Sequence, residues 1–131
     1  LVNTGTHPYP APQMTSLEAL LPEIMDRWSI PPERVIGHSD MAPARKSDPG
    51  PRFDWRRLAL QGLSVWPRSG CEARGSFLDL ARQFGYSAEA DETAILRAFR
   101  MRFRPWADGP ANAEDIALAA DLARRFPVRS V

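Results

Sequence analysis

The chain has 131 residues, a length that allows one ordinary domain, or a small domain with a fragment of a second. Its 44% of hydrophobic and 25% of charged residues are typical of a globular protein. A formal net charge of +1 provides no overall attraction to nucleic acid or to an anionic membrane. The single cysteine, Cys71, excludes an intrachain disulfide framework, and no apolar run is long enough to span a bilayer.

The N-terminal part of the chain predicts the end of a strand, a loop and a helix. Residues 1–3 fit the tail of a strand, and the prolines and glycine of residues 4–12 predict an irregular loop. Ser16 is a candidate helix cap, and apolar side chains follow it at helical spacing as far as Trp28. Pro22 interrupts this pattern and is expected to kink the helix or restart it.

A histidine and a carboxylate lie close together in the sequence that follows. The β-branched pair at 35–36 predicts a short strand that ends at His38, and a loop rich in Pro and Gly then brings back Lys46 and Asp48. A helix followed by a strand predicts an α/β layer. Zinc accepts imidazole and carboxylate ligands, but a catalytic zinc usually has three protein ligands and a water. The sequence therefore predicts a metal site with only two visible ligands.

The remaining sequence predicts a short helix, a linker and three further helices. The short helix begins near Trp55 and ends before Gly62, and the composition of residues 70–75 predicts a linker. The three helices are predicted to run from the cap Ser76 to Gly85, from Glu92 to Arg104, and onward from the cap Asn112. Their apolar positions give only a small core, so we expect these helices to lean on the first part of the chain.

Two loop segments and several flanking motifs resemble one enzyme family. The loop segments are GHSDMAP (37–43) and RKSDPGP (45–51), and the flanking motifs are FDW (53–55), QGL (61–63), WP (66–67) and FRMRFRP (99–105). They resemble the C-terminal part of the zinc-dependent N-acetylmuramoyl-L-alanine amidases of AmpD/AmiD type, and most of all the AmiD-like branch. In that branch a helical peptidoglycan-binding-like module follows the catalytic domain. The resemblance thus extends over nearly the whole chain.

The resemblance implies a role for each loop residue. His38 matches a zinc-binding histidine, Asp48 matches the carboxylate zinc ligand, and Lys46 matches the lysine that stabilises the oxyanion. The implied reaction is hydrolysis of the amide between N-acetylmuramic acid and L-alanine in bacterial peptidoglycan or in muropeptides. Lys46 is the only lysine in a chain that otherwise uses arginine, and the two side chains are not interchangeable beside an oxyanion.

The chain departs from the family pattern at two functional positions. The pattern also contains a first zinc-binding histidine and a glutamate that orients or deprotonates the water, and neither has a matching residue here. His7, the only other histidine, is most simply an exposed loop residue. We therefore expect that the chain is a piece of a longer protein, with weak zinc binding and little amidase activity of its own.

The resemblance also implies a fold and a division of the chain. Residues 1–69 are expected to form the C-terminal part of an α/β amidase domain with a mixed sheet. Residues 70–75 are the expected linker, and residues 76–131 the expected three-helix peptidoglycan-binding-like module. The AmiD-like module favours the bacterial envelope or periplasm, whereas AmpD-like enzymes, which lack it, are cytoplasmic.

Simpler interpretations stay open beside these assignments. His38 alone is most simply a hydrogen-bonded core histidine, Asp48 before Pro-Gly a turn residue, and Asp40 a side chain that caps or braces the loop. The whole piece is alternatively a non-catalytic peptidoglycan-binding module, in which Trp106 is a candidate for stacking on sugar. A weaker alternative is nucleic-acid binding by the Arg- and Phe-rich helix, although its arginines are more simply a solvated face.

Overall fold

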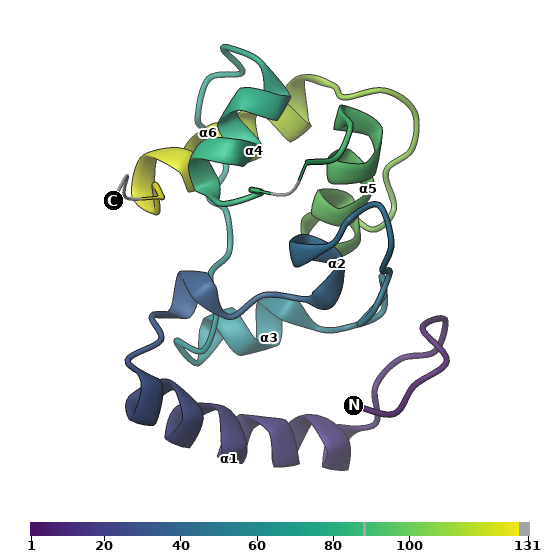
Figure 1. Cartoon of the computed structure of the whole chain (residues 1–131), viewed down its shortest axis with the longest axis vertical. Helices are drawn as coiled ribbons and strands as arrows, with labels where there is room; N and C mark the ends of the chain where they lie inside the picture. Colours follow the sequence, from purple (N-terminus) through teal and green to yellow (C-terminus); the bar gives the residue numbers. More distant parts are fainter. Residues whose placement is uncertain (88, 129–131) are drawn as a thin grey trace.

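The structure is a computed structural model that describes residues 1–87 and 89–128. Its elements are α1 (Ala11–Trp28), the 3-10 turn η1 (Pro32–Arg34), α2 (His38–Met41), α3 (Trp55–Leu60), α4 (Phe77–Phe84), α5 (Glu92–Phe103) and α6 (Ala113–Arg125). Figure 1 shows α1 at one end of the molecule, α4 to α6 at the other, and α2 and α3 between them. No helix in the described part of the chain combines the length and the apolar character needed to cross a membrane.

The predicted α/β fold with a mixed sheet is wrong, because residues 1–87 and 89–128 contain helices but no strand. Val35 and Gly37 do have extended backbone angles, as the β-branched pair suggested. A strand, however, also needs a neighbour that pairs with its backbone groups. Here the carbonyl of Val35 accepts hydrogen bonds from the side chains of Ser64 and Arg102 instead. The segment is extended chain held by side chains.

Helix α1 begins earlier than predicted and continues through Pro22. Pro10 is its N-cap and Pro12 lies in its first turn, where a missing backbone N–H costs no hydrogen bond. Ser16 is therefore not a cap; its hydroxyl donates to the carbonyl of Pro12 at 3.0 Å inside the helix. The helix ends at Ser29, which adopts a left-handed conformation with φ of 52°.

The three C-terminal helices begin at the predicted residues. Ser76 accepts a hydrogen bond from the Asp79 amide, and Asn112 accepts bonds from two amides of the first turn of α6. These caps satisfy amides that have no partner within the helix. Gly85 ends α4 with φ of 146°, a conformation that a side chain would strain. Cap residues thus located the starts of α4 and α6, and α5 begins at Glu92 as its apolar spacing predicted.

Three arginines of α5 and its end are buried, so the predicted solvated basic face is wrong. Arg100, Arg102 and Arg104 are 6%, 3% and 6% exposed, because each finds partners outside its own helix turn. Arg100 and Arg104 both bind Asp115 of α6. A nucleic-acid surface needs accessible cations, and burial removes these three from any such surface.

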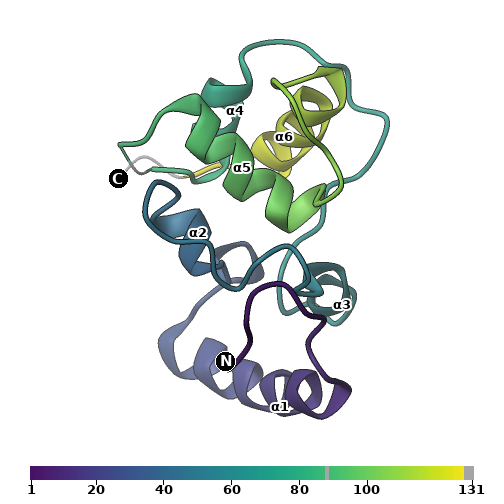
Figure 2. The same ribbon diagram turned by 90° about the vertical axis from the view of Figure 1, so that its right-hand side faces the viewer.

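Two hydrophobic clusters meet near the middle of the chain. We define the N-terminal cluster by its buried members Met14, Phe53, Trp55, Leu58 and Leu63. The C-terminal cluster contains the buried apolar residues Val65, Phe77, Ala81, Phe84, Tyr86, Ile95, Leu96, Ala98, Phe99, Phe103, Ala119 and Leu122. Trp66 packs against both clusters, and Figure 2 shows α2 lying against α5. The N-terminal and C-terminal clusters are therefore joined through packed side chains.

Candidate metal site

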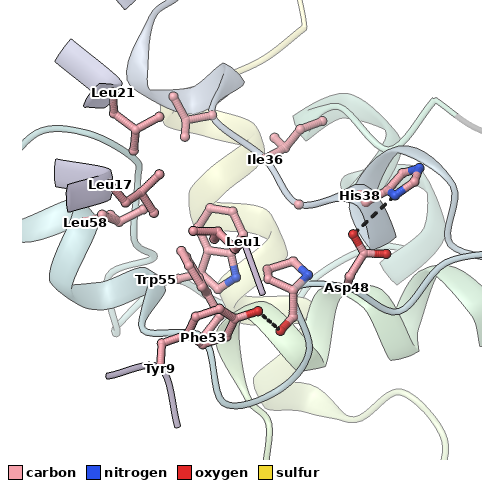
Figure 3. A pocket seen from close by; sticks show the side chains of 13 residues that line it. Leu1, Tyr9, Leu17, Leu21, Ile36, His38, Asp48, Phe53, Trp55 and Leu58 are labelled. Atoms are coloured by element: carbon pink, nitrogen blue, oxygen red, sulfur yellow. Dashed lines mark hydrogen bonds and ion pairs between the residues drawn. The ribbon is translucent and has the colours of Figure 1, made fainter. Parts of the chain in front are cut away.

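His38 and Asp48 lie next to each other, as the sequence predicted for a shared site. The His38 Nδ1 atom is 3.3 Å from the Asp48 Oδ2 atom. Both side chains face solvent, with 39% of His38 and 66% of Asp48 exposed. His38 is not at a strand end but is the first residue of α2, and Asp48 lies in the loop that follows. Figure 3 shows the pair beside a pocket.

Backbone contacts fix the distance between these two side chains. The Ser39 amide at the start of α2 donates to the carbonyl of Asp48 at 3.0 Å. Further along the loop, the amides of Arg45 and Lys46 both donate to the carbonyl of Ala42. The loop therefore turns back on α2 through its own hydrogen bonds, and it carries Asp48 to His38.

Asp40 braces the turn from which His38 projects. Its Oδ2 atom accepts a hydrogen bond from the Gly37 amide at 2.8 Å, and its side chain is only 6% exposed. This is the local capping role predicted for Asp40, and the bond satisfies an amide that α2 leaves free. Asp40 therefore holds the residue directly before His38.

Gly37 leaves no space for a side chain. A Cβ atom at this position would lie 2.7 Å from the Pro49 Cδ atom and 3.2 Å from the Trp55 ring. Its φ of −85° is open to any residue, so the requirement is space rather than backbone conformation. The start of α2 is consequently pressed against both the loop that carries Asp48 and the N-terminal cluster.

A pocket of about 230 Å³ opens beside the pair. Its wall is mainly apolar and includes Tyr9, Leu17, Ile36, Phe53 and Trp55, while His38 and Asp48 contribute an imidazole and a carboxylate. Small-molecule sites commonly combine apolar walls with a few convergent polar groups. The arrangement suits a ligand with an apolar part and a polar group directed at the pair.

Tyr9 is a pocket residue that the sequence did not single out. Its hydroxyl donates to the carbonyl of Pro49 at 2.9 Å, and its ring packs edge-on against Phe53. Burial, and then the nearby charge of Asp48, raise the pKa of Tyr9, so the hydroxyl remains a donor at neutral pH. No sequence pattern indicated this contact, because 40 residues separate the two partners.

Lys46 and His7 lie outside the pair. Lys46 is exposed, is not a pocket residue, and forms no ion pair with any side chain among residues 1–87 and 89–128. His7 is exposed and its Nδ1 atom lies 2.6 Å from the Thr4 hydroxyl. The structure thus brings together two of the residues singled out from the sequence and leaves Lys46 free in solvent.

The donor atoms of the pair fit a zinc ion as part of its ligand set. Two ligand atoms each about 2.0 Å from a tetrahedral zinc are about 3.3 Å apart, which matches the separation of Nδ1 and Oδ2. The same distance also describes a weak direct hydrogen bond between the two groups. No cluster of three His, Cys, Asp or Glu side chains suited to a metal occurs in the described part of the chain. The described residues would therefore offer a metal ion two candidate ligands, His38 and Asp48.

Comparisons with known proteins all point to one family of enzymes. Residues 1–51 match the family described as N-acetylmuramoyl-L-alanine amidase. The chain is 36% identical to the N-acetylmuramoyl-L-alanine amidase AmiD of Escherichia coli, over 91% of this chain and 50% of AmiD. A shorter match, 44% identical, relates 44% of the chain to 31% of the 1,6-anhydro-N-acetylmuramyl-L-alanine amidase AmpD of Enterobacter cloacae.

Solved structures agree with the sequence matches. The structure of Escherichia coli AmiD in complex with the substrate anhydro-N-acetylmuramic acid-L-Ala-D-gamma-Glu-L-Lys superposes with a TM-score of 0.79 at 34% identity, over 91% of this chain and 54% of that one. AmpDh3 of Pseudomonas aeruginosa, in complex with an anhydromuramic pentapeptide, also gives 0.79, at 32% identity over 93% and 56%.

The chain spans about half the length of AmiD and about a third of the length of AmpD. The match to AmiD nevertheless extends over nearly all of this chain, including the C-terminal helices. The loop motif, the family match and the shared fold agree with one another, and the chain belongs to the AmpD/AmiD-type family of N-acetylmuramoyl-L-alanine amidases.

Proposed function

We propose that this chain is part of a zinc-dependent amidase that hydrolyses the bond between N-acetylmuramic acid and L-alanine of peptidoglycan. The observation that carries the proposal is the 3.3 Å approach of His38 and Asp48 at the edge of an apolar pocket, in a chain of this family. The structures of AmiD and AmpDh3 contain anhydromuramic peptides, which supports muropeptides or peptidoglycan as the substrate class.

His38 and Asp48 are the residues that would hold the zinc ion. When bound, zinc supplies a Lewis acid for the amide carbonyl and for the attacking water. Asp48 is held in place by the Ser39 amide and by the Tyr9 hydroxyl bound to its neighbour Pro49. Both bonds go to backbone carbonyls and therefore hold the main chain at Asp48, which lowers the entropic cost of bringing its carboxylate to a metal ion.

Lys46 is the proposed partner of the oxyanion that forms when water attacks the carbonyl. Its ammonium group is exposed and forms no ion pair in the described part of the chain, so it is available to a substrate. A cation that comes close to a developing oxyanion stabilises the transition state more than the ground state. The apolar wall formed by Phe53 and Trp55 would exclude water beside the bond that is cleaved.

We further propose that this chain alone binds zinc weakly and hydrolyses its substrate slowly. The family pattern includes a further histidine ligand and a glutamate that acts on the water, whereas the described residues supply two ligands. A catalytic zinc usually has three protein ligands. In a longer protein of this family, the other half of the sequence would provide these groups.

Zinc titration by calorimetry tests the assignment of the pair. We expect His38→Ala and Asp48→Ala each to lower the zinc affinity strongly. Loss of an outer-shell partner already lowers the affinity about 10- to 100-fold, and loss of a ligand should cost at least as much. His7→Ala and Asp108→Ala are matched controls, since both remove an exposed residue of the same type elsewhere. Zinc affinity that survives in both His38→Ala and Asp48→Ala would contradict the proposed site.

A second candidate function is binding of glycan without turnover, favoured by an exposed aromatic side chain. Trp106 is 72% exposed and lies in a groove with Arg52, Asp54 and Pro51. Aromatic faces beside polar groups suit sugar rings. Co-sedimentation with insoluble peptidoglycan distinguishes the two functions: Trp106→Ala would reduce sedimentation and leave zinc affinity unchanged if the groove binds glycan.

The compartment follows from the substrate. Intact peptidoglycan lies in the bacterial cell envelope, whereas an enzyme that acts only on soluble muropeptides can work in the cytoplasm. We propose the envelope, because the chain matches AmiD along 91% of its length and AmpD along 44%. Activity of a full-length relative of this chain toward intact peptidoglycan, compared with soluble muropeptides, distinguishes the two.

A further inference from the structure

We propose that Tyr86 and Arg102, in the C-terminal part of the chain, are positioning residues that hold His38 through Asp40. The brace itself is a matter of contacts between side chains. Its consequence for zinc rests on the proposed function, in which His38 is a ligand. The C-terminal helices then serve the metal site directly, in addition to any binding of peptidoglycan.

Asp40 receives contacts from both parts of the chain. Its Oδ2 atom accepts from the Gly37 amide, the residue before His38, at 2.8 Å. Its Oδ1 atom accepts a 2.6 Å hydrogen bond from the hydroxyl of Tyr86, which is 2% exposed. The Nη1 atom of Arg102 lies 3.6 Å from Oδ2 as an ion pair. A buried carboxylate is tolerated only with such partners, so the position of Asp40 depends on the C-terminal part of the chain.

Arg102 holds the same region at two further points. One of its nitrogens, Nη2, donates to the Ser64 hydroxyl at 3.1 Å and to the Val35 carbonyl at 3.4 Å. Its guanidinium lies 4.7 Å from the centre of the Trp55 ring and 4.8 Å from that of Phe103. A cation between two aromatic faces is stabilised by both, and these two rings belong to different hydrophobic clusters. Arg102 thus connects the N-terminal and C-terminal clusters through its contacts with Trp55 and Phe103.

The contacts of Asp40 can affect His38 and Asp48 because residues 37–39 are tightly packed. A Cβ atom at Gly37 would already meet Pro49 and Trp55, so the backbone before His38 has little room to shift toward either of them. The Ser39 amide, next to His38 on the other side, is bonded to the carbonyl of Asp48. His38 therefore lies between two fixed residues, and a shift of Asp40 changes the orientation of His38 relative to Asp48.

A purely local role for Asp40 is the simpler alternative. In that case Asp40 only caps α2, and Tyr86 and Arg102 contribute to stability alone. The exposure of His38 at 39% makes the two cases distinguishable, because an exposed imidazole is not displaced by a general loss of stability in protein that remains folded. An observation on His38 itself therefore decides between them.

The test uses three variants of this chain. Tyr86→Phe removes only the hydroxyl that binds Asp40, and Arg102→Met removes the charge and every donor while retaining a long apolar side chain. Arg125→Met is the matched control: Arg125 also joins a buried aspartate, Asp121, and a carbonyl, that of Trp66, but in the described part of the chain it forms no hydrogen bond or ion pair with α2. Tyr86→Phe remains informative if Arg102→Met does not fold.

The first measurement is the NMR signal of the His38 ring, without metal and well below the melting temperature. The chain has two histidines, so His7 is an internal reference. We expect Tyr86→Phe and Arg102→Met to displace the His38 signal and leave His7 in place, and Arg125→Met to displace neither. A His38 signal in Tyr86→Phe and Arg102→Met that coincides with that of the parent chain would overturn the proposal.

The second measurement is zinc affinity per folded molecule. We expect Tyr86→Phe to weaken it about tenfold, the lower end of the effect of losing an outer-shell partner, and Arg125→Met to leave it unchanged. Equal losses in Tyr86→Phe and Arg125→Met would overturn a specific role. A displaced His38 signal in a chain that binds no zinc in any form would support the brace and contradict the metal site.

Discussion

Asp115 and Asp48 are two aspartates in opposite surroundings. Asp115 is fully buried, and its oxygens accept hydrogen bonds from Arg100, Arg104 and the Asn112 amide. Asp48 is 66% exposed, and within residues 1–87 and 89–128 its carboxylate has one hydrogen-bond or ion-pair partner, His38. A carboxylate whose acceptor positions are all filled holds a fold together, whereas one with free lone pairs can still bind a ligand. The contrast shows that Asp115 has its acceptor positions filled, whereas Asp48 keeps the open positions that its proposed role as a metal ligand requires.

Removal of Asp115 gives the largest expected effect on stability. Asp115→Ala leaves Arg100 and Arg104 buried without their main partner, and breaking a buried pair in this way costs about 3–5 kcal/mol. Urea denaturation measures the free energy of unfolding. Asp108→Ala, at an exposed aspartate, is the control and should change it little. A loss below about 1 kcal/mol in Asp115→Ala would contradict the structural role of this aspartate.

Gly37→Ala is expected to damage both stability and the metal pair. The added methyl group overlaps the Pro49 side chain, and overpacking of this kind costs about 1–3 kcal/mol. The double variant Gly37→Ala with Pro49→Ala removes the overlapping atom, so a double-mutant cycle should recover part of the loss. Additive losses in the cycle would show that the packing against Pro49 is not the constraint.

Acid should weaken the C-terminal helices through their buried aspartates. Burial alone would raise the pKa of Asp115 and of Asp121, but hydrogen bonds from arginines and backbone amides hold each pKa below its ordinary value. A lowered pKa in the folded state gives stability that is complete above about pH 4 and is lost as the pH falls further. Urea midpoints recorded from neutral pH downward measure this loss. In Asp121→Asn the decline should be shallower, and an unchanged slope would contradict the assignment.

Asp48→Asn has the smallest expected effect on stability and a large one on zinc. The His38–Asp48 pair is exposed on both sides, and exposed ion pairs contribute within about 0.5 kcal/mol. The amide nevertheless removes the charge that a metal ligand needs, so zinc affinity should fall as in Asp48→Ala. Thermal melting and calorimetry on the same sample give both quantities. A strong loss of stability would place Asp48 with Asp115 as a structural residue.

The sequence located most helices because their signals are local. Ser76, Gly85 and Asn112 act on backbone groups within a few residues of themselves, and the structure has each of them at a helix end. Asp40 as a brace was predicted on the same basis and is confirmed by its bond to Gly37. The division at residues 70–75 stays a prediction, and the packing of Trp66 against both clusters shows how closely the two sides are joined.

Features that depend on a distant partner were out of reach of the sequence. The extended pair at 35–36 fitted a strand, but a strand is defined by its neighbour, and here its carbonyl partners are side chains from residues 29 and 67 positions away. The helical spacing predicted that Arg102 faces solvent. It is buried instead, because Asp40 and Trp55 lie against it.

The sequence by itself determined the family and the positions of the C-terminal helices, and it singled out His38 and Asp48, whose role as metal ligands stays a prediction. Motif chemistry and helix caps are properties of neighbouring residues, so they can be recognised without a fold. The tertiary structure alone decided the rest: that His38 and Asp48 border a pocket, that no strand pairing occurs among the described residues, and that Tyr86 reaches Asp40 across 46 positions. These depend on which side chains share a buried space, and that is settled only when the whole chain packs.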